Sequence, residues 1–103
     1  MSISEQYRLA AKDWVDKQAA AQMLEECKTA ELAQRVSMLP SEWSMSKKEH
    51  TVKATEEWRE WIRGMVDARK AANLAKVKLE FLRMKFQEQQ GEEATARAEM
   101  KMQ

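Results

Sequence analysis

The sequence has few of the residues that interrupt helices and few of those that build catalytic or metal sites. It contains one proline, two glycines, one cysteine and one histidine in 103 residues. So little proline and glycine excludes a collagen-like or loop-rich chain. A single cysteine excludes an internal disulfide, and one cysteine with one histidine excludes zinc sites built from several such ligands.

Long apolar runs are also missing. No stretch approaches the roughly 20 apolar residues that span a bilayer. The N-terminus has neither the basic start nor the apolar core of a secretory signal. We therefore expect a cytoplasmic protein with no membrane partner.

What the sequence does contain is typical of long helices. Charged residues make up 34% and hydrophobic residues 44% of the chain, a balance that favours an all-α protein. We expect one domain over residues 1–103. Because long helices spread so short a chain thinly, much apolar surface stays uncovered and a partner is expected.

The clearest pattern lies between residues 51 and 89. Read at alternating steps of three and four, every position from Ala54 to Phe86 is apolar. This spacing predicts one long helix with a single buried stripe. The stripe consists of Ala54, Trp58, Trp61, Met65, Ala68, Ala72, Ala75, Leu79, Leu82 and Phe86.

A second helix precedes this one, and the two form a hairpin. The first helix is expected over about 4–39 and stops at Pro40, which disfavours helical geometry in the residue before it. A connection over 40–46 leads to the second helix, over about 47–90, with Ser46 in a capping box. So short a connection makes the helices antiparallel neighbours. Gly91 suits a helix end, and 91–103 is expected as a short third helix or a tail.

A turn centred near residue 42 fixes which residues face each other. It sets Trp58 opposite Cys27, which is expected to be a buried structural thiol. Trp61 falls opposite Met23. The same register brings together charges of opposite sign: Asp13 and Asp16 with Arg69 and Lys70.

A second apolar line follows the opposite side of the second helix. Since the first helix covers only one side, this line is predicted to contact another protein, as a homodimer or with a client. It consists of Leu74, Val77, Phe81 and Met84. Trp43, in the connection, is a further candidate anchor for a partner; the alternative is that it folds back onto the end of the hairpin.

Basic residues line both shoulders of the second helix and raise a nucleic-acid hypothesis. Residues 47–90 carry 11 basic and 7 acidic side chains, and such a row could follow a phosphate backbone. The alternative is a solvated shoulder that pairs with the acidic first helix. The residues concerned are Arg69, Lys70, Lys76, Lys78, Arg83 and Lys85.

No constellation points to catalysis. His50 has no neighbouring ligand set, and no Glu-x-x-His motif occurs. Cys27 lies beside Glu25 and Glu26 and lacks a basic neighbour that would clearly activate it. We expect no enzyme activity, no cofactor, no metal and no small-molecule substrate.

Two segments carry a resemblance. Residues 53–73, beginning Lys53-Ala-Thr-Glu-Glu-Trp, and 77–88, Val77-Lys-Leu-Glu-Phe-Leu-Arg-Met-Lys-Phe-Gln-Glu, resemble a family of small helical proteins of tailed phages and prophages. The ending near 93–100 is similar to that family's ending. The resemblance implies a phage origin, the host bacterial cytoplasm and a link to phage recombination genes, with no catalytic residue to transfer.

These observations together predict a non-enzymatic phage accessory protein. It is expected to bind a phage or host protein in DNA recombination or replication, or host nuclease machinery. One alternative is a single-stranded nucleic-acid-binding protein. Another is an inhibitor of a bacterial defence complex, similar in kind to anti-CRISPR proteins.

Overall fold

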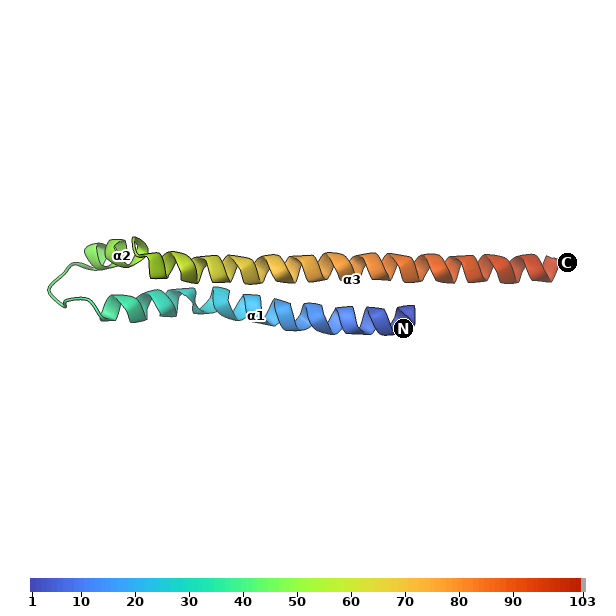
Figure 1. The fold of residues 1–103 in the computed structure, drawn as a ribbon, viewed down its shortest axis with the longest axis horizontal. Coiled ribbons are helices and arrows are strands. Elements are labelled where there is room, and N and C mark those ends of the chain that lie inside the picture. The colour runs from blue at the N-terminus through green and yellow to red at the C-terminus, as the bar shows by residue number, and fades with distance from the viewer. Residues whose placement is uncertain (103) are drawn as a thin grey trace.

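The computed structural model describes residues 1–102 as a long helical hairpin (Figure 1). It contains three helices, α1 (Ile3–Ser37), α2 (Met45–Lys53) and α3 (Glu56–Met102), and these described residues form no strand. The molecule measures 87 × 17 × 16 Å. The predicted all-α antiparallel hairpin is confirmed. Within the described range, none of the helices is long and apolar enough to cross a membrane.

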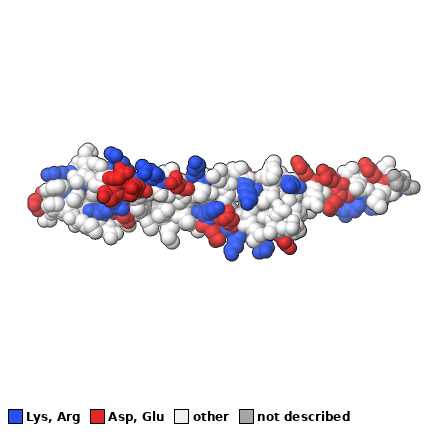
Figure 2. All heavy atoms as spheres, viewed as in Figure 1, with Lys and Arg blue, Asp and Glu red and all other residues white. Residues whose placement is uncertain are grey.

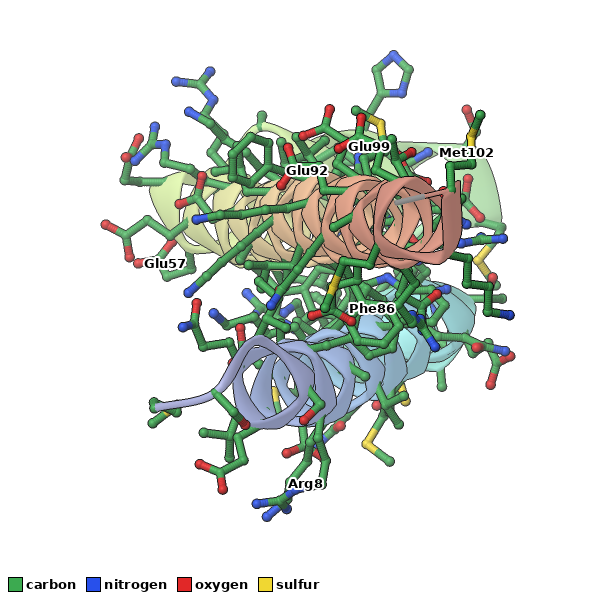
Figure 3. All side chains as sticks on the ribbon, turned by 90° about the vertical axis from the view of Figure 1, so that its right-hand side faces the viewer. Arg8, Glu57, Phe86, Glu92, Glu99 and Met102 are labelled. Carbon is green, nitrogen blue, oxygen red and sulfur yellow. The ribbon has the colours of Figure 1, made fainter. Side chains whose placement is uncertain are left out.

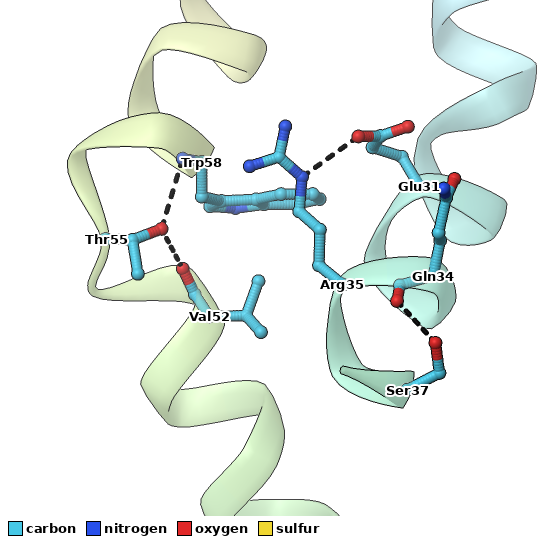
Figure 4. Close-up of polar contacts among 7 residues, drawn as sticks. All are labelled: Glu31, Gln34, Arg35, Ser37, Val52, Thr55 and Trp58. Carbon is cyan, nitrogen blue, oxygen red and sulfur yellow. Dashed lines mark hydrogen bonds and ion pairs between the residues drawn. The ribbon is translucent and has the colours of Figure 1, made fainter. Parts of the chain in front are cut away.

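The predicted second helix is in fact two helices. α2 and α3 are separated at Ala54 and Thr55, and the cap of α2 is Ser44, which accepts from the Lys47 amide, rather than Ser46. The Thr55 hydroxyl donates to the Val52 carbonyl at 2.6 Å and accepts from the Trp58 amide at 3.2 Å (Figure 4). One side chain thus ends α2 and caps α3.

The break shifts the register of the hairpin. Trp58 packs with Val36 and Val52 at the closed end, not opposite Cys27. Both Cys27 and Met23 are exposed, so the predictions of a buried thiol and of a Met23–Trp61 contact are wrong. The helix α2 lies between the turn and α3. Each residue of α3 therefore faces a residue of α1 that is more than two helical turns closer to the turn than predicted.

The seam between α1 and α3 follows the predicted stripe. From Trp58 to Phe86 every residue of that stripe is buried or half-buried, whereas Ala54 is exposed. Ala21 and Ala72 are fully buried, 0% exposed. Figure 3 shows Phe86 pointing toward α1 and Arg8 pointing away from α3. Alanine at the seam lets the two backbones approach closely, which keeps the hairpin narrow.

α3 does not end near residue 90. It continues through Gly91 to Met102 and projects beyond the N-terminus of α1 (Figure 1). A methyl group added at Gly91 would meet nothing within 4 Å. A glycine inside a helix costs only about 1 kcal/mol relative to alanine, so the helix formers on either side of Gly91 carry the helix through it. The expected short third helix or tail is therefore the last part of α3.

Candidate functional site

The outward face of α3 carries a line of uncovered apolar side chains. We call Leu74, Val77, Phe81 and Met84 the outer face; each is 57–62% exposed. Their spacing of three and four residues places them together on one side of the helix. The apolar stripe from Trp58 to Phe86, here called the inner stripe, occupies the side of α3 toward α1. The helix α1 therefore covers none of the four outer-face side chains. The structure thus brings these four predicted interaction residues together on one open surface.

Basic side chains lie on both shoulders of α3, between the stripe that faces α1 and the outer face. Lys78 and Lys85 lie seven residues apart on one shoulder, and Arg69, Lys76 and Arg83 form a row of the same spacing on the other. Lys76 and Lys78, two positions apart, point to different sides of the helix. The predicted nucleic-acid residues are therefore not gathered on a single face. Figure 2 shows basic and acidic side chains interspersed along the rod.

Arg69 is the cation of this group that binds α1. Its guanidinium donates to both Glu25 carboxylate oxygens, at 2.6 and 2.7 Å, and to the Gln18 amide oxygen at 2.6 Å. The predicted pairing of Arg69 with Asp13 or Asp16 is wrong, because the register places Glu25 beside it. Asp13 instead pairs with Lys17 of its own helix. The other five basic residues of this group make no ion pair within residues 1–102; they are Lys70, Lys76, Lys78, Arg83 and Lys85.

The Arg69 contact shifts both pKa values. Hydrogen bonds from Arg69 hold the pKa of Glu25 below its ordinary value of 4.5, and the same bonds raise the pKa of Arg69. A lowered carboxyl pKa means that the pair stabilises the fold above the ordinary value. This stabilisation is lost as the pH falls through the lowered folded-state pKa.

We expect Glu25→Gln to lower the melting temperature above about pH 5 and to have little effect in strong acid. Thermal unfolding followed by circular dichroism over a pH series measures this difference. Glu60→Gln is the control, because Glu60 is exposed and takes part in no ion pair of residues 1–102. An equal loss for Glu25→Gln at every pH would show that the charge pair is not responsible.

The closed end of the hairpin holds a cluster of aromatic and charged side chains. The rings of Trp58 and Trp61 stack with centroids 5.5 Å apart and planes 11° from parallel. Arg35 lies 5.8 Å from the Trp58 ring centroid and donates to Glu31 at 2.9 Å (Figure 4). Neither Arg35 nor Thr55 was expected from the sequence to act here. Because Trp58 is buried and Arg35 is paired with Glu31, this cluster stabilises the closed end of the hairpin and is not an open binding site.

Trp43, the second predicted anchor, lies in the connection between α1 and α2. It is half-buried, and its amide donates to the Pro40 carbonyl at 3.2 Å. The Lys47 ammonium lies 4.0 Å from its ring centroid, a cation–π contact that covers part of the ring. Trp43 thus contacts its own chain and keeps only part of its surface open, so the outer face is the stronger candidate.

Catalytic groups do not converge anywhere in the part of the chain described. Residues 1–102 include no group of three or more His, Cys, Asp and Glu side chains placed to hold a metal. His50 and Cys27 are both exposed. A shallow groove of about 320 Å³ lies where the N-terminus of α1 meets α3, lined by Ser4, Tyr7, Arg83, Phe86, Gln87 and Gln90. All of these side chains except Phe86 can form hydrogen bonds, and the set includes no nucleophile paired with a base.

Comparison with protein-family models, with curated proteins and with solved structures found no match to this chain.

Proposed function

We propose that this chain is a non-enzymatic protein that acts by binding another protein through the outer face of α3. The observation that supports this is the exposure of four large apolar side chains, each more than half open, in one line on a continuous helix. Contiguous exposed apolar surface of this kind marks interaction sites in soluble proteins. An apolar helix face with i, i+3 and i+4 anchors is the recognition surface of helix-to-helix contacts.

The biological setting of this proposal comes from the resemblance to small helical phage proteins. In this setting the chain is an accessory protein in the bacterial cytoplasm that acts in phage DNA recombination or replication, or on host nuclease machinery. Inhibition of a bacterial defence complex belongs to the same class of action, because it too needs a protein-binding surface and no catalytic group.

Single-stranded nucleic-acid binding is the second candidate. It is favoured by the exposed cations Lys76, Lys78, Arg83 and Lys85, which make no ion pair within residues 1–102. Two features weigh against it: these cations occupy both shoulders, and the chain's pI is about 7.8, below the range typical of dedicated binders. Binding of a labelled oligonucleotide that weakens steeply with salt would favour it.

Site-specific photo-cross-linking tests the leading proposal. A benzophenone amino acid replaces Phe81 in one variant and Met23 in the other; Met23 is comparably exposed but lies on α1. Irradiation in bacterial cells is expected to give protein adducts from position 81 and few from position 23. Equal yields at the two positions, or none at position 81, would contradict the proposal. The mass of each adduct identifies a second copy or a different protein.

A further inference from the structure

Among residues 1–102, no other helix lies beside the last part of α3. Trp58 packs with Val36 at the closed end, and Tyr7 and Phe86 line one groove at the open end. Continuing this register, Ile3 at the start of α1 lies opposite about residue 90. The segment 91–102, here called the projecting segment, is therefore a lone helical rod (Figure 1). Most helical stability in proteins comes from tertiary packing, and this segment packs on no other helix of residues 1–102.

The line of the outer face continues toward the C-terminus through three small side chains, Gly91, Thr95 and Ala98. At the same steps of three and four, Met84 is followed by Glu88, Gly91, Thr95, Ala98 and Met102. Gly91, Thr95 and Ala98 leave a shallow surface, whereas Leu74, Val77 and Phe81 stand out from the first half of the line. The two halves are thus complementary in side-chain size.

The two halves are also complementary in charge. Lys70, Lys78 and Lys85 accompany the outer face, Glu92 and Glu99 lie on the projecting segment, and Glu88 lies just before it. Figure 3 shows Glu92 and Glu99 on the side of α3 away from α1, which is the side of the outer face. Figure 2 shows carboxylates on the projecting end. None of these six side chains makes an ion pair within residues 1–102.

We propose that the projecting segment of a second copy of this chain lies antiparallel on the outer face, and that the two copies do this reciprocally. Phe81 of each copy then sits over Gly91 of the other, Val77 over Thr95, and Leu74 over Ala98. This proposal rests on the proposed function and names the partner at that surface.

Charge favours this register over a pairing centred on residue 79, in which the two copies would overlap further and form a shorter dimer. In the proposed pairing Lys78 lies beside Glu92 of the other copy, and Lys85 lies beside Glu88. If the copies instead paired symmetrically about residue 79, Lys78 and Glu80 would each meet their own counterparts. In the proposed register only Lys85 meets its own counterpart, with Glu88 of the other copy beside it. Like charges set together at the flanks of a helix pair are unfavourable.

The pairing predicts an extended dimer. The two rods overlap only through the region from about residue 70 to the end of α3. At 1.5 Å rise per residue, two chains 87 Å long then make a dimer about 125 Å long. Each end carries a hairpin tip with its Trp43, so the dimer presents two identical ends on opposite sides.

A charge exchange tests the pairing in the full chain. Lys78→Glu and Glu92→Lys are each expected to weaken the dimer about tenfold, because each turns two symmetric attractions into repulsions. The double variant Lys78→Glu/Glu92→Lys is expected to recover most of that loss. Lys76→Glu, on the other shoulder, is the matched control and should have little effect. Sedimentation equilibrium measures the dissociation constants. Failure of the double variant to recover would overturn the pairing.

Cysteine cross-linking tests the register without depending on charge. In a Cys27→Ser background, Lys85→Cys is expected to link to its counterpart with a short bis-maleimide, whereas Lys78→Cys is not. The reverse result would overturn the proposed register in favour of the one centred on residue 79. If both variants stay monomeric while position 81 still photo-cross-links to a different protein, the self-pairing is wrong and the proposed function stands.

Discussion

Trp58→Ala is expected to destabilise the hairpin by about 3–5 kcal/mol, a range typical of large aromatic-to-alanine changes in a core. Trp58 is only 5% exposed and lies at the junction of all three helices, with Val36 of α1 and Val52 of α2. Its removal takes away the stacking partner of Trp61 and the surface beneath Arg35. We expect α2 to detach and the closed end to open.

Urea unfolding followed by circular dichroism, at one fixed protein concentration, measures this loss. Trp43→Ala is the matched control, since Trp43 is only half-buried and contacts the connection rather than the core. Its expected cost is about 1 kcal/mol. A Trp58→Ala loss no larger than that of Trp43→Ala would contradict the assignment of Trp58 as the central core residue.

Ala72→Leu is expected to destabilise the chain by about 1–3 kcal/mol through overpacking. Ala72 and Ala21 are both fully buried, and the register places them on facing helices at the same level. Leucine at position 72 has no space to occupy unless the two backbones separate. Separation would weaken the seam on either side, including the contact between Arg69 and Glu25.

The control for this prediction is Ala19→Leu, the same chemical change at an exposed position of α1. It should leave the free energy of unfolding nearly unchanged, and the same urea experiment measures both variants. If Ala72→Leu were as stable as Ala19→Leu, α1 and α3 could not be in close contact at this level.

The helical stripes could be predicted from sequence because they depend only on local periodicity. From Trp58 to Phe86 the inner stripe needs nothing beyond the 3.6-residue repeat, and the same repeat places Leu74 and Phe81 on the other side. The candidate site was therefore visible as a pattern before the structure. The outer face is exposed because α1 packs only on the inner stripe, on the opposite side of α3.

The register could not be predicted in the same way, because it depends on the turn. The apolar stripe runs through Ala54 without interruption and hides the break at Thr55. A signal was present: Thr55 followed by Glu56 and Glu57 is a capping residue before an acidic first turn. Once α2 is separated, Trp58 moves away from Cys27 and Arg69 moves to Glu25.

The helix end was misplaced because a single glycine is weak evidence against a helix. Gly91 is followed by Glu, Ala and Arg residues that favour helix, and these outweigh its cost of about 1 kcal/mol. In the proposed dimer this last segment supplies Glu92, the carboxylate placed beside Lys78 of the other copy. A contact of this kind joins residues of different copies, so periodicity within one chain does not display it.

Oxidation of methionine side chains tests most directly whether the outer face of α3 is covered by protein in solution. Met84 and Met23 are 57% and 67% exposed in the single chain, so peroxide should oxidise them at similar rates if the chain stands alone. We expect Met84 of the purified protein to be strongly protected relative to Met23 and to lose this protection on dilution. Equal oxidation of the two methionines at high concentration would contradict it.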